Sequence, residues 1–229
     1  EGLADAFGLL SSMNFGLHLH QFSLALFGLL QSAMVSFAAG HGALKVVANC
    51  AVGVDNFDIQ AATRLGVALS NTPGVLTKTT ADLAFALILA TARQVVQGDR
   101  DVRAGRWKSW HPFAYTGPDI HGATLGIIGL GRIGSRVADL LVPWRVQLLA
   151  CDPYVDDALF VHHNARPVDL NDLLAESDVV TLHCNLTAET RGLIDRERLV
   201  LMKSSAFLIN TSRGPVVDID ALCDALASD

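Results

Sequence analysis

An α/β fold with a doubly wound parallel sheet is the class that this sequence predicts, and three observations lead to it. From Leu44 onward, short apolar runs alternate with segments of helical periodicity. The apolar runs are continuous rather than interrupted at every second residue, as in strands that helices cover on both faces. One run ends in a Gly-x-Gly-x-x-Gly turn that opens a helix, which is a tight strand-to-helix connection.

Six of the apolar runs are expected to be strands. They occupy Lys45–Asn49, Gly66–Ser70, Thr124–Gly129, Val146–Cys151, Val179–His183 and Ala206–Asn210. Helical patterns separate them, and the first of these covers Asp58–Leu65. A turn signal, Asn71-Thr72-Pro73-Gly74, follows the second strand. A long helix is expected over Thr79–Ala104, because Thr79 with Asp82 resembles a capping box and a glycine follows Ala104.

The composition limits the classes of function. The 229 residues are 51% hydrophobic, enough for one large domain or for one domain and part of another. With 17 Lys and Arg against 23 Asp and Glu, the chain is mildly acidic and lacks the basic runs of a nucleic-acid binder. Its four cysteines form no Cys-x-x-Cys pair, so we expect no metal site and no disulfide framework. This cysteine usage, with an acidic start unlike a signal peptide, favours a cytoplasmic location.

An almost uncharged stretch precedes this region. No Asp, Glu, Lys or Arg occurs from Ala6 to Leu44, and Phe22–Ala39 is an apolar-rich run of eighteen residues. That length is the lower edge of a transmembrane helix, but polar residues interrupt the run and flanking cations are missing. We therefore favour a buried core segment or a poorly specified leader over membrane insertion.

The glycine-rich turn predicts a dinucleotide site. Gly129 permits the tight turn, Gly131 lets the backbone approach a diphosphate, and Gly134 lets the helix pack closely on the strand. The first N–H groups of that helix, at Arg132 and Ile133, would face the anion. Together these features indicate a Rossmann domain.

An acidic residue follows the next strand at the position that such a site requires. Asp152 lies eighteen residues after Gly134, where a carboxylate accepts hydrogen bonds from the adenosine ribose. The same carboxylate would repel a 2′-phosphate, so the expected cofactor is NAD rather than NADP. An ordinary tight turn with a surface aspartate is the alternative.

From about Leu44 to its end, the chain resembles the D-isomer-specific 2-hydroxyacid dehydrogenase family. The motifs that carry the resemblance are Val52-Gly53-Val54-Asp55-Asn56, Ser70-Asn71-Thr72-Pro73, Thr80-Ala81-Asp82-Leu83-Ala84, the Gly129–Gly134 turn, Asp152-Pro153-Tyr154, Leu182-His183-Cys184 and Ile209-Asn210-Thr211-Ser212-Arg213-Gly214. The Trp107 to Pro112 loop is similar to the glyoxylate and hydroxypyruvate reductase branch. Asp152-Pro153-Tyr154 is also similar to phosphoglycerate dehydrogenases, and both branches stay open.

The resemblance implies an NAD-dependent oxidoreductase that transfers a hydride between nicotinamide and a small 2-keto or 2-hydroxy acid. Reduction of a keto acid requires a group that holds the carboxylate and an acid that protonates the oxygen. Arg213 matches the family's arginine that grips the carboxylate and polarises the keto oxygen, for which a guanidinium fork is suited. Val52 and Gly53 match the loop whose N–H groups bind the same carboxylate. A surface arginine and a plain turn are the alternatives.

Further matches concern the coenzyme. Thr80 matches a residue near the nicotinamide, although a helix N-cap would also explain a threonine there. Thr211 and Ser212 match a segment beside the nicotinamide. Cys184 and Asn185 match the loop under the adenine, where Asn185 stands in the place of the family's usual proline.

The resemblance also suggests a domain organisation. Residues 1–75 would be part of a flavodoxin-like substrate domain, with 1–43 atypical of it, and 76–229 would be an NAD-binding domain truncated at its C-terminus. The family's catalytic Glu and His motifs, which follow the helix that begins near Asp218, do not occur in this sequence. None of its histidines matches them, and His183 is interpreted as a satisfied core or loop residue. We therefore expect a fragment of a longer product or a truncated gene.

Two alternatives to an enzyme stay open. One is a non-catalytic dinucleotide-binding sensor or corepressor-like protein, and the other is an inactive truncated remnant. In the family, the long helix over Thr79–Ala104 and the loop after it pack against a second subunit. This likeness predicts a homodimer, in which Trp110 is a candidate to reach the neighbour's site.

Overall fold

The structure is a computed structural model that describes residues 44–228. The expectation for the apolar run Phe22–Ala39 lies outside these residues. Contacts divide the chain into two units, one ending at Pro73 and the other beginning at Gly74.

The described part of the first unit, from Leu44 to Pro73, forms a parallel β-α-β connection. Strand β1 (Val46–Ala48) pairs in parallel with β2 (Ala68–Ser70), and helix α3 (Ile59–Arg64) connects them. Asp58 caps α3 by accepting a hydrogen bond from the N–H of Ala61 at 2.7 Å. The small core of this unit comprises Ala62 and Val67, with Leu44, Val47, Phe57 and Leu69 packed against them.

The second unit is built on five parallel strands, which confirms the predicted doubly wound sheet. The strands are β3 (Thr124–Ile128), β4 (Gln147–Cys151), β5 (Arg166–Pro167), β6 (Val179–Leu182) and β7 (Phe207–Asn210). Their order in the sheet is β5-β4-β3-β6-β7. Strand order therefore reverses between β3 and β6, the point at which ligands bind in open α/β sheets. Four of the five strands were predicted, whereas the two-residue edge strand β5 was not.

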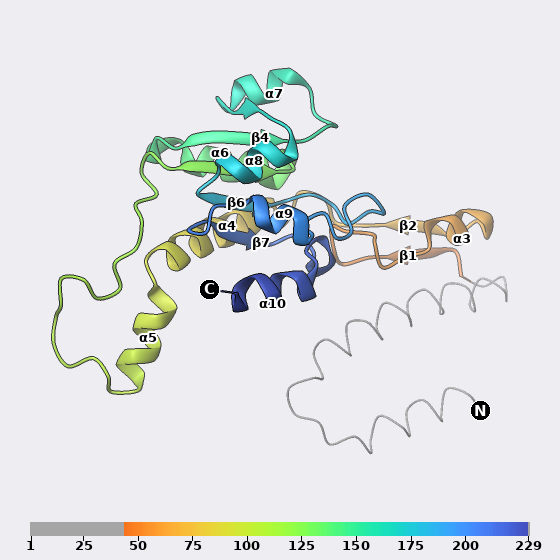
Figure 1. The fold of residues 1–229 in the computed structure, drawn as a ribbon. Coiled ribbons are helices and arrows are strands. Elements are labelled where there is room, and N and C mark those ends of the chain that lie inside the picture. The colour runs from red at the N-terminus through yellow and green to blue at the C-terminus, as the bar shows by residue number, and fades with distance from the viewer. Residues whose placement is uncertain (1–43, 229) are drawn as a thin grey trace, which may run out of the picture. The chain divides into compact units, whose positions relative to one another are not determined.

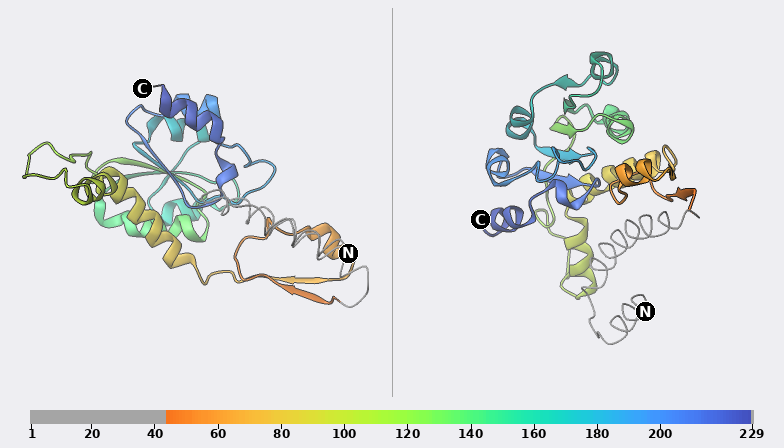
Figure 2. Two further views of the ribbon diagram at one scale, coloured as in Figure 1. Left: turned by 90° about the horizontal axis from the view of Figure 1, so that it is seen from below. Right: turned by 90° about the vertical axis from the view of Figure 1, so that its right-hand side faces the viewer.

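Helices cover both faces of this sheet (Figures 1 and 2). Helices α4 (Thr77–Ala92) and α6 (Arg132–Leu141) pack together over one face, where Ile88, Leu125, Ile127, Val137 and Leu141 form a buried core. Helices α8 (Leu170–Glu176), α9 (Arg196–Leu201) and α10 (Ile219–Ala227) lie over the other face, whose core includes Leu173, Leu174, Val180, Leu182 and Ile194. The remaining elements of this unit are α5 (Val95–Arg103), α7 (Asp157–His162), and the short 3-10 turns η1 (Val142–Trp144) and η2 (Gly214–Val216). Strands buried on both faces explain the continuous apolar runs.

The prediction of one long helix over Thr79–Ala104 is wrong. The segment forms two helices, α4 and α5, and the chain bends by 66° between them. Gln94 lies between them in the left-handed conformation, with φ of 51°. The returning chain packs against the end of α4 so closely that a Cβ at Gly117 would lie 1.7 Å from the Ala92 carbonyl oxygen. The Gln94 side chain also donates to the Thr116 carbonyl at 2.7 Å. Contacts with residues more than twenty positions away therefore fix the break.

The predicted capping box is also wrong. Helix α4 begins two residues earlier than Thr79, and its N-cap is Leu76. The Thr79 hydroxyl donates to the Leu76 carbonyl at 3.1 Å and does not cap a helix. Thr80 is likewise not an N-cap, because its N–H donates to the same carbonyl at 2.9 Å within the first turn.

Within residues 44–228, no single helix is long and apolar enough to cross a membrane; the bent pair α4 and α5 together meets the length and composition of a span.

Candidate functional site

The carboxyl ends of four neighbouring strands bring most of the predicted residues of the second unit to one edge of the sheet. Strand register places Ile128 beside Cys151 and Leu182, and Leu182 beside Asn210. The residues that follow these positions, Gly129, Asp152, His183 and Thr211, therefore leave the sheet at the same edge. This edge is where open α/β sheets bind ligands.

The glycine-rich turn has the geometry that its sequence predicted. Gly129 has φ of 93°, and a Cβ on it would lie 2.7 Å from the Cys184 nitrogen. A Cβ on Gly134 would lie 2.1 Å from the Gly129 carbonyl oxygen, so only glycine allows α6 to approach the turn this closely. A Cβ on Gly131, by contrast, would meet nothing within 4 Å. Gly131 thus borders open space that a side chain would occupy.

The open space lies where an anion would be held. Gly131 is the N-cap of α6, and the N–H groups of Arg132 and Ile133 have no acceptor within the helix. The positive end of the helix dipole and these N–H groups favour a negative group. The residues present therefore fit a dinucleotide diphosphate.

Asp152 joins the glycine turn to the end of β4. One carboxylate oxygen accepts from the Leu130 N–H at 2.8 Å, and the other accepts from the Tyr154 N–H at 3.0 Å. Each oxygen keeps a second lone pair for another donor. The side chain is thus held beside the turn, in the arrangement that a ribose-binding carboxylate requires.

Asn210 organises the loop after β7. Its side-chain oxygen accepts from the N–H and hydroxyl of Ser212 at 2.9 and 2.8 Å, and its amide donates to the Arg213 carbonyl at 2.9 Å. Arg213 is half-buried, and one of its guanidinium nitrogens donates to the Ser212 carbonyl at 3.0 Å. Thr211, Ser212 and Arg213 therefore form one ordered turn at the predicted edge.

His183 lies between this turn and the end of β6. Its ring nitrogens are 3.0 Å from the Thr181 hydroxyl and 3.5 Å from the Thr211 hydroxyl. Burial lowers the pKa of His183 to about 4, because the charged imidazolium would lose its hydration. The imidazole is therefore neutral at pH 7 and cannot act as a general acid there.

Of the two residues of the predicted adenine loop, Cys184 lies next to the glycine turn. The Cys184 main chain abuts Gly129, and burial raises the pKa of the Cys184 thiol. The Asn185 carbonyl accepts from the Thr190 hydroxyl at 2.6 Å. This hydrogen bond holds the segment without the proline that is usual in the family.

Val52 and Gly53 belong to the first unit, in the loop after β1. The Asn71 amide donates to the Val52 carbonyl at 2.8 Å, and the Asn49 amide donates to the Gly53 carbonyl at 2.8 Å. Within residues 44–228, the N–H groups of Val52 and Gly53 have no acceptor. The two asparagines therefore fix the carbonyls, and the N–H groups stay available for further hydrogen bonds.

Asn49, Asn71 and Asn210 received no role in the sequence analysis, although each one positions a predicted site loop. Their position in the sequence is the signal that could have identified them. Each is an asparagine directly at the carboxyl end of an apolar strand, where its side chain can hydrogen-bond a turn.

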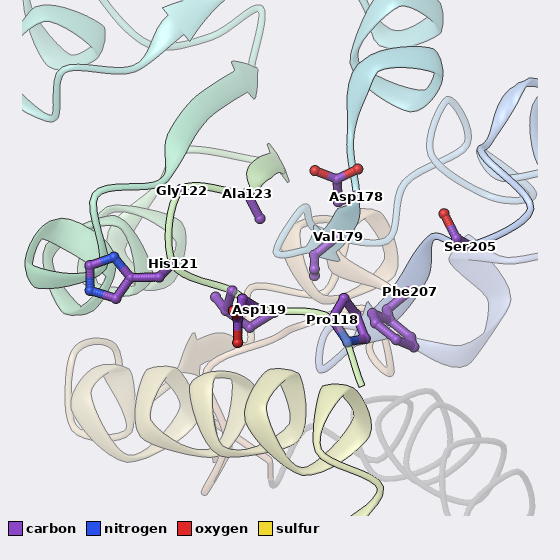
Figure 3. A pocket seen from close by; sticks show the side chains of 10 residues that line it. Pro118, Asp119, His121, Gly122, Ala123, Asp178, Val179, Ser205 and Phe207 are labelled. Carbon is purple, nitrogen blue, oxygen red and sulfur yellow. The ribbon is translucent and has the colours of Figure 1, made fainter. Parts of the chain in front are cut away.

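Two cavities border the second unit. One of about 550 Å³ lies between the first turn of α4 and α6, and Lys78, Arg132 and Arg136 line it. The other, of about 360 Å³, opens at the amino ends of β3, β6 and β7, away from the predicted residues (Figure 3). Its Asp178 is engaged by Lys203 at 2.7 Å and by the Thr124 N–H at 2.9 Å, so this carboxylate has a structural role. No group of metal-ligating side chains occurs in the described part of the chain.

The strand order, the glycine turn and Asp152 define the second unit as a Rossmann dinucleotide-binding domain. Residues 85–229 match the family described as D-isomer specific 2-hydroxyacid dehydrogenase, NAD binding domain, and the chain belongs to this family. The predicted resemblance is confirmed, and so is NAD as the cofactor of this domain.

Similar proteins include two glyoxylate reductases. The protein from Pyrococcus horikoshii is 52% identical over 187 residues, and that from Korarchaeum cryptofilum is 50% identical over 184 residues. Each alignment covers 80% of this chain, but only 56% and 55% of the respective relative. The chain thus spans little more than half the length of these relatives.

Solved structures agree with this placement. The D-lactate dehydrogenase from Aquifex aeolicus, complexed with NAD and lactic acid, is 33% identical with a TM-score of 0.74. A glyoxylate reductase from Paecilomyes thermophila is 35% identical with a TM-score of 0.73. Both cover 81% of this chain, and the chain covers 55% and 56% of those structures.

Proposed function

We propose that this chain is part of an NAD-dependent oxidoreductase that transfers a hydride between nicotinamide and a small 2-keto or 2-hydroxy acid, of the glyoxylate or hydroxypyruvate type. The observation that carries the proposal is the Gly129–Gly134 turn with Asp152 beside it, at the strand-order reversal. Glyoxylate reductases among the similar proteins support the substrate class.

The proposed coenzyme contacts follow from this edge of the sheet. The N–H groups of α6 would hold the diphosphate, and Asp152 would accept from the adenosine ribose. Cys184 and Asn185 would border the adenine, while Thr80, Thr211 and Ser212 would border the nicotinamide. NAD supplies the hydride acceptor or donor when it is bound.

Arg213 would hold the substrate carboxylate and polarise the keto oxygen, because its planar fork can donate two parallel hydrogen bonds. In the first unit, the N–H groups of Val52 and Gly53 would bind a substrate carboxylate. Their unpaired state in the described chain supports this role. His183 does not supply the proton, since its pKa of about 4 keeps it neutral.

We further propose that residues 1–75 are part of a substrate domain and that 76–229 are the NAD-binding domain. A homodimer is proposed through α5 and the loop that follows it. Helix α5 has no buried residue, and Val96 and Val102 are more than half exposed on it. Trp110, in the loop that follows α5, is exposed to 76%. Such surfaces are typical of protein contacts. The free cysteines fit the proposed cytoplasmic location.

NADH oxidation by the complete gene product, of which this chain is proposed to be a part, tests the function. Glyoxylate, hydroxypyruvate and phosphohydroxypyruvate would be compared as substrates, with an Arg213→Gln variant as the matched control. We expect turnover with at least one of the first two acids and its loss in the variant. A protein that binds NADH but reduces none of the three acids would contradict an enzyme and favour a dinucleotide sensor.

A further inference from the structure

His183 contacts three of the segments that the proposed function assigns to the coenzyme at this edge of the sheet. Its main chain follows β6 directly, and its N–H donates to the Ile128 carbonyl at 2.8 Å. A Cβ on Gly129 would lie 2.8 Å from the His183 carbonyl carbon, so the His183–Cys184 peptide supports the glycine turn. The side chain reaches the third segment, the turn that begins at Thr211.

The imidazole spans two strand ends through two hydroxyl groups. Nε2 lies 3.0 Å from Oγ1 of Thr181, which is completely buried, and Nδ1 lies 3.5 Å from Oγ1 of Thr211. Thr181 is a buried residue of strand β6, so its hydroxyl holds one side of the imidazole ring in place. The contact with Thr211, at 3.5 Å, is at the long limit of a hydrogen bond.

A neutral imidazole is suited to this link. One ring nitrogen donates and the other accepts, so the two threonine hydroxyls must take complementary orientations. Within the described residues, His183 makes no ion pair, and burial keeps it uncharged. The ring therefore orients two hydroxyls without bringing a charge next to a coenzyme.

We propose that His183 is a positioning residue, which holds the Thr211 hydroxyl and thereby sets the Thr211–Ser212 turn against the nicotinamide half of the coenzyme. The inference rests on the proposed function, because that assigns this turn to the nicotinamide. It predicts a selective effect. Loss of the link should weaken binding of NADH but not of ADP-ribose, which shares the adenosine diphosphate and lacks the nicotinamide.

Two substitutions separate the two hydrogen bonds of the ring. In His183→Asn the amide occupies the place of Nδ1 and can still reach Thr211, whereas in His183→Gln it occupies the place of Nε2 and reaches Thr181. Calorimetry with NADH and with ADP-ribose would be carried out on the full chain. We expect His183→Gln to weaken NADH binding about fivefold, the effect of one lost hydrogen bond, and to change ADP-ribose binding less than twofold. His183→Asn should restore most of the NADH affinity.

Thr211→Val tests the same link without altering the ring. It removes only the hydroxyl, so it should produce the same selective loss, and combining it with His183→Gln should add little. If His183→Gln does not fold, Thr211→Val still tests whether the contact between His183 and Thr211 supports NADH binding. Unchanged NADH affinity in Thr211→Val, or an equal loss of NADH and ADP-ribose in His183→Gln, would overturn the inference. A wild-type chain that binds neither ligand would instead refute the proposed function, and the inference with it.

Discussion

A single methyl group at Gly131 should separate folding from coenzyme binding. Gly131 has φ of −72° and ψ of −158°, a backbone conformation open to alanine, and its Cβ would meet nothing within 4 Å. Alanine is a poorer N-cap than glycine, but it also restricts the unfolded chain, and these effects oppose each other. We expect the free energy of unfolding of Gly131→Ala to change by less than about 1 kcal/mol.

The coenzyme should respond differently to this methyl group. The added carbon would fill the space through which the main chain approaches the diphosphate. Loss of this close approach should raise the Kd for NADH at least about tenfold, which corresponds to about 1.4 kcal/mol. Calorimetric titration with NADH, together with thermal unfolding followed by circular dichroism, measures both quantities.

Two alanine variants are matched controls. Gly134→Ala would place a Cβ 2.1 Å from the Gly129 carbonyl oxygen. Because the turn would be overpacked, the free energy of unfolding should fall by about 1–3 kcal/mol and the Tm by several degrees. Gly98→Ala lies on α5, where the nearest atom would be 4.0 Å away, and it should alter neither quantity adversely. A Gly131→Ala protein that binds NADH with wild-type affinity would refute the role of this turn.

Three further predictions concern other residues. Arg213→Lys in the complete gene product should lose most turnover and keep its NADH affinity, because lysine lacks the planar fork. Steady-state kinetics and calorimetry measure the two quantities, and intact turnover in this variant would reject the role of Arg213. Asp152→Ala should weaken NAD binding and relax discrimination against NADP, since a repelling carboxylate and an acceptor are lost; an unchanged ratio of the two affinities would reject that role. Burial lowers the pKa of His183 from 6.5 to about 4. Between pH 6.5 and pH 4, the His183 imidazole therefore binds a proton in the unfolded chain but not in the folded one. Stability should therefore fall by at most about 3 kcal/mol as the pH drops from 6.5 to 4, and urea unfolding should show a smaller decrease for His183→Gln.

Much of the secondary structure of the second unit could be predicted from local sequence patterns. The apolar runs at Thr124–Gly129 and Val179–His183 predicted strands within one residue of β3 and β6, because strands covered on both faces leave a continuous apolar signal. The two-residue strand β5 has no such apolar signal, because it consists of Arg166 and Pro167 and lies at an exposed edge of the sheet. The break at Gln94 was missed for a different reason. No glycine or proline marks it, and the loop at Gly117 imposes it.

The sequence by itself determined the sheet class, the glycine turn and the acid at Asp152, because each depends on residue types at short spacing. The roles of Arg213, Val52 and Gly53 stay predictions. Only the tertiary structure decided which side chains hold the site in shape. The Thr211 hydroxyl meets the His183 ring from 28 positions away, and the Asn71 amide reaches the Val52 carbonyl from 19. Strand register creates such contacts, and register depends on packing across the whole sheet, for which a short stretch of sequence carries no local signal.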